Sequence, residues 1–172
     1  LAGMPRVRGI FRRPLLDLSR ATVRSAVPAG APVVDDPHNA DPRFARSRVR
    51  HTVLPMLESE LGPGIAEALA RTADLARADT DALAELADEV AHDVMSNAAE
   101  AGALDVESLA ALSDALRSRV VRMWLVERGC PAGSLGAEHV GRVVALVTAW
   151  KGQGAVAVPG GVEVARERGI LR

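Results

Sequence analysis

The chain contains very few cysteine, lysine and aromatic residues. Cys130 is the single cysteine among 172 residues, which excludes an internal disulfide and a cysteine-based zinc site. Tyrosine is absent, aromatic residues make up 2% of the chain, and Lys151 is the one lysine beside twenty arginines. No apolar run reaches membrane-spanning length and no signal peptide is visible. A reducing cytoplasm is therefore the expected compartment.

Histidine is also sparse, and its spacing predicts no metal site. The four histidines are scattered singly along the chain, at His38, His51, His92 and His139. A metal centre needs several such ligands at close, regular spacing or brought together by the fold, and no such spacing is present. We therefore expect no bound metal in this chain.

Positive and negative charges are unevenly distributed. The net charge is −1, but residues 1–57 carry +6 and residues 58–172 carry −7. Such asymmetry indicates that an anionic partner meets the first third of the chain. The alternative is a solvated basic face balanced by the acidic remainder, and charge alone does not separate the two.

The most distinctive stretch is residues 33–57. It holds the acidic pair Asp35 and Asp36, then a turn-forming run, then four arginines within eight residues, Arg43, Arg46, Arg48 and Arg50. The guanidinium group is a rigid donor fork suited to phosphates and base edges. If this part is helical, Arg43, Arg46 and Arg50 lie on one face.

The order of residues in this stretch resembles the junction segment of the tRNA(Ile)-lysidine synthase family. That family has (Glu/Asp)-Asp-Pro-(Ser/Thr)-Asn-x-Asp, then Arg-Asn-x-(Ile/Val)-Arg-His, then a hydrophobic residue, Leu and Pro. The chain supplies Asp35-Asp36-Pro37-His38-Asn39-Ala40-Asp41, Arg46-Ser47-Arg48-Val49-Arg50-His51 and Leu54-Pro55. His38 and Ser47 depart from the pattern, and Ser47 lacks the amide of the family Asn. Arg13-Pro14-Leu15-Leu16 also matches the family.

Residues 1–57 have the pattern of strand, helix and strand. We expect a strand at 10–11, a short helix capped by Ser19 with Val23 and Ala26 facing inward, and a buried strand at 33–34. This order is typical of the last piece of a parallel α/β sheet. The segment 58–64 breaks the pattern and is the predicted domain boundary.

Helix dominates after residue 65. Apolar residues from Ile65 onward fit a 3.6-residue period and predict a helix of about thirty residues. Asp105 caps a short helix, another begins at 113 or 114 and ends before Gly129, and one more spans 136–150. The tail predicts a β-hairpin over 155–166, turning at 159–161, and a second turn at 168–169.

The resemblance implies a mainly α chain in two parts. Residues 1–57 would be the C-terminal remnant of a PP-loop ATP-binding synthetase domain, an α/β fold like that of the adenine nucleotide α-hydrolases. Residues 58–172 would be a helical tRNA-binding domain ending in a small β-hairpin. The chain would thus be the C-terminal portion of a longer enzyme.

The family activity is the modification of the wobble cytidine of an isoleucine tRNA with a CAU anticodon. ATP, with magnesium, adenylates the base, and the amine of free L-lysine displaces AMP to give lysidine. The family phosphate loop, Ser-Gly-Gly-x-Asp-Ser, is absent from this sequence. We therefore expect the chain to be an inactive fragment that binds neither ATP nor any other cofactor by itself. A homodimer remains open.

The resemblance and the residue types together suggest a set of site residues. Arg13, Arg46 and Arg50 are expected to bind ATP or tRNA, the alternative for Arg46 and Arg50 being surface ion pairs with Asp35 or Asp36. Asp36 and Asn39 are expected to structure the loop beside the site. His51 is expected to pack, and no residue is assigned to catalysis. Arg119 and Arg122 could reach the tRNA backbone, the alternative being a solvated face.

A second function class competes with the ligase. The chain could be a helical RNA-binding or protein-interaction module without chemistry of its own. A Ser-Gly-Gly-x-Asp-Ser motif encoded in frame upstream of Leu1 would decide for the ligase.

Overall fold

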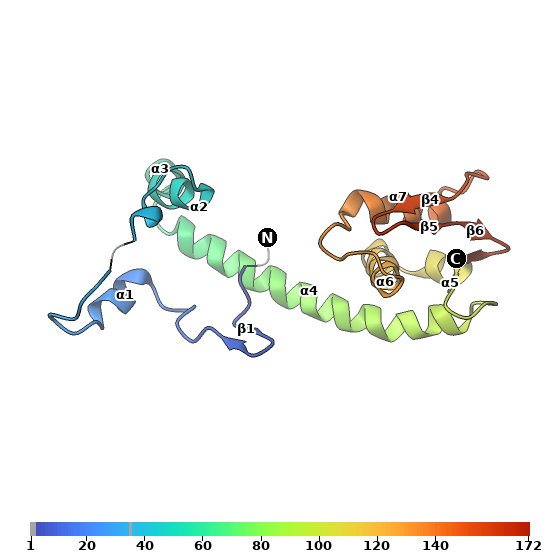
Figure 1. The fold of residues 1–172 in the computed structure, drawn as a ribbon, viewed down its shortest axis with the longest axis horizontal. Helices are drawn as coiled ribbons and strands as arrows, with labels where there is room; N and C mark the ends of the chain where they lie inside the picture. Colours follow the sequence, from blue (N-terminus) through green and yellow to red (C-terminus); the bar gives the residue numbers. More distant parts are fainter. Residues whose placement is uncertain (1–2, 35) are drawn as a thin grey trace. The chain divides into compact units, whose positions relative to one another are not determined.

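The structure is a computed structural model that describes residues 3–34 and 36–172 (Figure 1). Helices make up most of its regular structure, so the mainly α fold class is confirmed. The chain divides into two compact units, Leu1–Ala78 and Asp79–Arg172. The long helix α4, Ile65–Ser96, contributes to both units, so the predicted boundary at 58–64 stays a prediction.

The first unit consists of short elements. They are β1 (Val7–Arg8), β2 (Phe11–Arg12), α1 (Arg20–Ser25), η1 (Pro37–Asn39), α2 (Ala45–Arg48), η2 (Val49–Val53) and α3 (Leu54–Leu61). β1 and β2 form an antiparallel hairpin that turns at Gly9, whose φ is 56°. The hydroxyl of Ser19 accepts a 3.0 Å hydrogen bond from the amide of Thr22, which confirms the predicted cap of α1.

The predicted strand–helix–strand unit is not formed. Val33 and Val34 are not in a strand, and the Val34 side chain is 90% exposed. Ile10 lies in the turn between β1 and β2, and Ala26 is exposed whereas Val23 is half-buried. Every strand pairing among the described residues is antiparallel. A pair of β-branched residues makes a strand only where a partner strand supplies hydrogen bonds and a packing surface, and here none does.

The segment from α2 to α3 is one continuous helical stretch with a wide turn inside it. η2, Val49–Val53, is a π-helical turn and directly precedes Leu54 and Pro55. Pro55 has no N–H group, so it cannot make the α-helical bond to the carbonyl of His51. Such single π turns occur inside α-helices where the regular ladder is interrupted.

The helix α4 has 32 residues, as the apolar period predicted. Its start is capped by the carboxylate of Glu58, which accepts bonds from the amides of Gly64 (2.7 Å) and Ala66 (2.9 Å). Gly62 and Gly64 have φ of 96° and 97°, conformations that favour glycine, and they separate α3 from α4.

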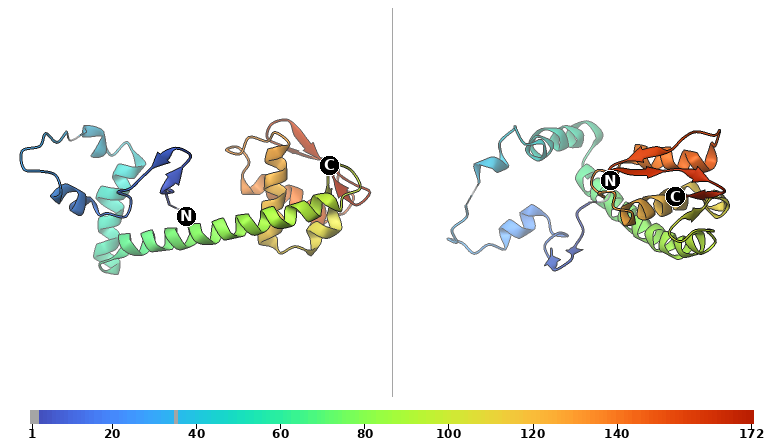
Figure 2. Two further views of the ribbon diagram at one scale, coloured as in Figure 1. Left: turned by 90° about the horizontal axis from the view of Figure 1, so that it is seen from below. Right: turned by 45° about the vertical axis from the view of Figure 1, so that its right-hand side comes forward.

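The second unit adds three helices and small antiparallel sheets. They are β3 (Leu104–Asp105), α5 (Val106–Ala111), α6 (Asp114–Glu127), α7 (Ala137–Thr148), β4 (Val156–Val158), β5 (Val162–Val164), β6 (Arg166–Glu167) and β7 (Ile170–Leu171). The predicted hairpin is confirmed as β4–β5, with Val156 opposite Val164, and it lies beside α7 (Figure 2). Asp105 caps α5 through a 2.7 Å bond from the amide of Ser108, and Gly129, with φ 94°, follows the end of α6.

The hydrophobic core of the described residues lies wholly in this second unit. Every buried apolar residue comes from α4 after residue 79, from α5 to α7, from the strands or from their connections, and the largest fully buried ones include Leu109, Leu125, Leu146 and Leu171. Burial raises the pKa of the Cys130 thiol, which keeps this group neutral. None of the described helices is both long and apolar enough to cross a membrane.

Candidate functional site

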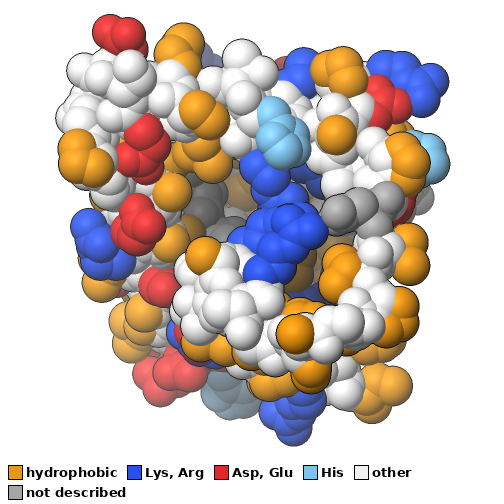
Figure 3. Space-filling view, turned by 90° about the vertical axis from the view of Figure 1, so that its left-hand side faces the viewer, with side chains coloured by type: hydrophobic (Ala, Val, Ile, Leu, Met, Phe, Trp, Pro, Cys, Tyr) orange, Lys and Arg blue, Asp and Glu red, His pale blue; other side chains and the backbone are white. Residues whose placement is uncertain are grey.

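A hollow of about 390 Å³ in the first unit brings together residues that are far apart in the sequence. Its lining comes from α1, from the η1 turn and from η2: Arg20, Arg24, Asp36, Pro37, Asn39, Ala40, Arg50 and His51. Figure 3 shows basic side chains, in blue, gathered near a histidine around a hollowed part of the surface. Of the predicted site residues, Asp36, Asn39 and Arg50 therefore meet in one place.

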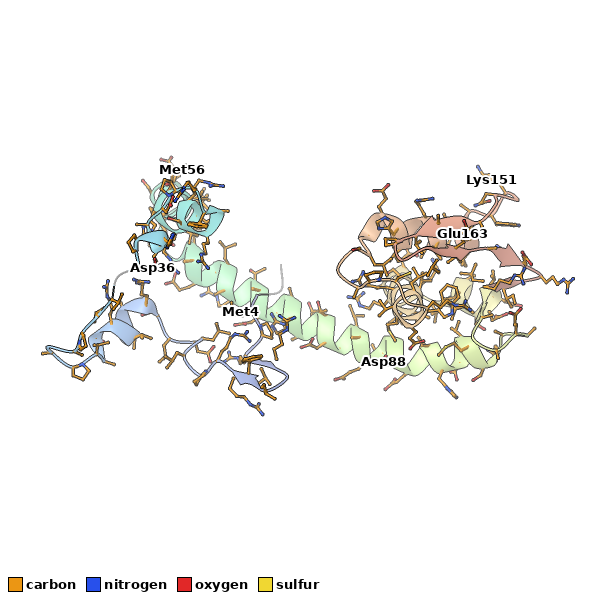
Figure 4. The ribbon with its side chains drawn as sticks, viewed as in Figure 1. Met4, Asp36, Met56, Asp88, Lys151 and Glu163 are labelled. Atoms are coloured by element: carbon orange, nitrogen blue, oxygen red, sulfur yellow. The ribbon has the colours of Figure 1, made fainter. Side chains whose placement is uncertain are left out.

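The wall of this hollow is held by bonds within the η1 turn. Asp36, labelled in Figure 4, precedes η1, and its Oδ1 accepts from the amide of His38 (2.9 Å) and lies 2.9 Å from Nδ1 of the same residue. The amide of Asn39 donates to the carbonyl of Asp36 (3.0 Å). Nε2 of His51 lies 3.2 Å from the carbonyl oxygen of Asn39, so the loop is joined to the helix that follows it.

Two arginines of the cluster make structural bonds at the start of the helix. Arg43 forms an ion pair with Asp41 (2.6 Å from Nη2 to Oδ2), and this hydrogen-bonded pair lowers the pKa of the Asp41 carboxyl. Nη1 of Arg48 donates to the carbonyls of Pro42 (2.8 Å) and Arg43 (3.0 Å). Their guanidinium groups are therefore occupied within the chain.

Arg46 and Arg50, unlike Arg43 and Arg48, make no structural bonds through their guanidinium groups among the described residues. Both side chains are exposed, and among the described residues neither guanidinium group has an ion-pair or hydrogen-bond partner. The alternative of a surface ion pair with Asp36 is not formed, because Asp36 bonds to His38, and Asp35 lies outside the described residues.

The prediction that Arg43, Arg46 and Arg50 share one helical face is wrong. Arg43 precedes the helix, which begins at Ala45. The π turn η2 contains Arg50 and changes the angle around the helix axis between Arg46 and Arg50. Arg50 lines the hollow, whereas Arg46 does not. Ser47, which stands where the family has Asn, is buried, with 3% exposure.

Arg13 lies apart from this hollow. Its Nη1 donates to the carbonyl of Pro5 (2.9 Å) and its amide to that of Arg6 (2.9 Å), which closes the base of the β1–β2 hairpin. It lines a separate hollow of about 580 Å³ formed by the hairpin itself. The structure therefore does not bring Arg13 together with Arg50.

Arg119 and Arg122 belong to the second unit, where they line a hollow of about 490 Å³ between α6 and α7. Nη1 of Arg119 donates to the carbonyl of Ala115, within its own helix (2.9 Å). Arg122 donates to the carbonyls of Ala132 (2.8 Å) and Leu135, and so fixes the connection between α6 and α7. Arg122 thus has a structural role that leaves less of its guanidinium group for a ligand.

Sequence reasoning missed Arg20 and Arg24 as lining residues. Their i, i+4 spacing behind the Ser19 cap places both on one face of α1, which was a usable signal. The local sequence pattern does not show that this face of α1 lies beside Arg50. No group of three or more His, Cys, Asp or Glu among residues 3–34 and 36–172 could hold a metal ion.

The chain is similar to known proteins over nearly its whole length. A family model described as the TilS substrate binding domain matches residues 104–172. The tRNA(Ile)-lysidine synthase of Streptomyces coelicolor is 46% identical over 99% of the chain and 49% of its own length. The synthase of Thermobifida fusca is 49% identical over 93% of the chain and 49% of its own length. The synthase of Mycobacterium bovis is 45% identical over 92% of the chain and 49% of its own length. The chain spans about half the length of the curated relatives it matches.

Proposed function

Because the chain belongs to the tRNA(Ile)-lysidine synthase family, we propose that it acts as part of an ATP-dependent ligase that converts the wobble cytidine of an isoleucine tRNA to lysidine. The motif of residues 35–55, from which the resemblance was inferred, agrees with this family assignment. The proposed partners are tRNA(Ile) with a CAU anticodon, free L-lysine and ATP with magnesium, and the proposed compartment is the cytoplasm.

The observation that carries this proposal is that two of the four arginines in residues 43–50 have partners within the chain and the other two have none among the described residues. Arg43 and Arg48 are occupied by Asp41 and by backbone carbonyls, whereas the guanidinium groups of Arg46 and Arg50 are exposed and unpaired among the described residues. A fixed guanidinium group stabilises charge that develops on phosphate and binds tRNA phosphates through its two-pronged geometry. We assign Arg46 and Arg50 to binding of ATP or tRNA, with Asp36 and Asn39 shaping the loop beside them.

The second unit is proposed to bind tRNA. The support is that the substrate-binding family model matches residues 104–172, which include most of this unit. Arg119 is the better candidate of the two predicted arginines, because Arg122 is bonded to Ala132 and Leu135. The competing hypothesis is an interaction module without chemistry. It is disfavoured because relatives that bear a synthase name match 99% of the chain.

The proposal predicts a large loss of activity when the arginine fork is removed from the full-length enzyme. Lysine keeps the charge but loses the bidentate geometry. Arg50→Lys and Arg46→Lys should each lower lysidine formation at least about tenfold, equivalent to roughly 1.4 kcal/mol of transition-state stabilisation. The matched control is Arg71→Lys, an exposed arginine of α4 that lines none of the hollows described above.

The corresponding alanine variants test the ligand class. If the contact is to tRNA phosphate, Arg46→Ala and Arg50→Ala should make tRNA affinity less dependent on salt, which is measured by tRNA binding at two salt concentrations. Turnover at the wild-type level in both lysine and both alanine variants would contradict the assignment.

The chain alone is proposed to lack activity, because the family phosphate loop is absent from its sequence. Backbone N–H groups of such a loop are what cradle the phosphates of ATP. Calorimetry of the 172-residue chain should therefore detect no binding of ATP in the micromolar range. Micromolar affinity would show that another part of the chain binds the nucleotide.

A further inference from the structure

The hollow that contains Arg50 has a second basic wall that the motif of residues 35–55 does not include. Arg20 and Arg24 lie four residues apart on α1, and both line the same hollow as Arg50 and His51. We propose that Arg20 and Arg50, with Arg24 beside them in the lining, form a binding site for a phosphate group. This inference rests on the proposed function in taking Arg50 as a ligand-binding residue.

The charge balance of the hollow favours an anion. Three of the eight described residues that line it are arginines, and Asp36 is the one carboxylate among these eight. The Oδ1 atom of Asp36 is bonded to the amide and ring of His38. The guanidinium groups of Arg20 and Arg50 have no hydrogen-bond or ion-pair partner within the described residues. The like charges of Arg20 and Arg50 around one hollow repel each other, and a phosphate relieves that repulsion while accepting hydrogen bonds from both forks.

The frame of the hollow is built independently of these arginines. The η1 turn is closed by Asp36, and the bond between His51 and the Asn39 carbonyl joins it to η2. α1 is capped by Ser19, and its own fold does not need the Arg20 side chain. Replacing Arg20 should therefore remove a ligand contact without collapsing the wall. The volume, about 390 Å³, lies in the range of small-molecule sites.

The phosphate can come from two sources, a free nucleotide or the tRNA backbone. Both present the same tetrahedral, anionic oxygens, and the same pair of arginines, Arg20 and Arg50, would bind either. A nucleotide would be displaced from the hollow by AMP, whereas a backbone phosphate would be displaced by a tRNA transcript. Direct competition separates them.

The test is calorimetric titration of the 172-residue chain with inorganic pyrophosphate. Wild-type chain should bind with an affinity of about 1 mM or tighter, and Arg20→Gln and Arg50→Gln should each weaken binding at least about fivefold. Arg20→Lys should retain part of the affinity because it keeps the charge. Arg71→Gln on α4 is the matched control and should bind like the wild type. Far-UV circular dichroism checks that each variant is folded.

Competition by AMP or by an unmodified tRNA(Ile) transcript then assigns the source. Either result supports the site, since each displaces the pyrophosphate from the same arginines. If Arg50→Gln weakens binding and Arg20→Gln does not, the α1 wall is not part of the site, and the proposed function stands. If pyrophosphate does not bind to the wild-type chain, or if neither substitution changes its affinity, the phosphate site is rejected. The turnover measurements on the full-length enzyme then decide the proposed function separately.

Discussion

The two units of the chain are stabilised by different means. In 79–172, helices and strands bury a continuous apolar core. In 1–78, Ser47 is the one buried residue among those described, and large apolar side chains such as Ile10, Val34 and Leu75 are exposed. Burial of apolar surface is the main favourable term in folding, so the first unit has little of it.

What holds the first unit is a series of local hydrogen bonds. The Ser19 cap, the Asp36 turn, the Arg43–Asp41 pair and the Glu58 cap each fix a few neighbouring residues. Each such bond contributes little net stability. The lesson is that the candidate site and the stable core lie in different parts of the chain, so changes to one should leave the other largely unaffected.

The largest expected effect comes from opening a cavity in the core. Leu125 is fully buried, whereas Leu75 on α4 is 67% exposed. Leu125→Ala should lower the free energy of unfolding by about 2–5 kcal/mol. Leu75→Ala should change it by less than about 0.5 kcal/mol. Urea unfolding followed by circular dichroism compares them, and similar losses in both variants would remove the contrast between the two units.

A smaller loss is expected at a buried arginine. Arg117, with 8% exposure, donates to the carbonyls of Leu109 (2.9 Å), Ala110 (3.0 Å) and Leu112, and pairs with Asp114 (2.7 Å). Arg117→Ala removes the guanidinium donor from all three carbonyls, of which that of Leu109 keeps the bond from the Leu112 amide (3.2 Å). The substitution should reduce the free energy of unfolding by about 2–3 kcal/mol.

The control for this change is Arg119→Ala in the same helix. Arg119 bonds to the Ala115 carbonyl of its own helix, so its loss should stay within about 0.5 kcal/mol. Thermal unfolding of both variants measures the difference. An Arg117→Ala protein as stable as wild type would mean that water replaces the guanidinium group at no cost.

The smallest expected effect is that of removing the first unit's short elements. A chain beginning at Glu58 retains α4 and the whole core, so residues 65–150 should fold without residues 1–57 and melt cooperatively near the temperature of the full chain. A chain of residues 1–78 should melt without a sharp transition. If the Glu58 chain lacks a cooperative transition by circular dichroism, the predicted boundary at 58–64 is wrong.

Sequence patterns predicted the second unit well because its signals are local and agree with one another. The apolar period gave α4, the Asp105 cap gave α5, and Gly129 marked the end of α6. The Pro-Gly-Gly turn gave the β4–β5 hairpin. Each of these depends on neighbouring residues and on burial against one core.

The site was only partly predictable, because arginine roles depend on what surrounds each side chain. Nothing in the spacing separates Arg48, which bonds to the Pro42 carbonyl, from Arg50, which lines the hollow. Arg20 lines the same hollow as Arg50 although thirty residues separate them in the sequence, and no local period indicates that they meet. The strand expected at 33–34 failed for a related reason, since a strand is defined by a partner elsewhere in the chain.

The π turn at Val49–Val53 acts as an offset of one residue in an otherwise α-helical stretch. Pro55 would still interrupt the hydrogen-bond ladder if one residue were deleted there, because its ring nitrogen carries no hydrogen. Each α-helical residue turns the chain by about 100°, so a deletion between Arg46 and Arg50 would change their i, i+4 spacing to i, i+3 and rotate the two side chains by that angle relative to each other. A gap of one residue at this point in a relative would thus preserve the helix and still redistribute its positive charges.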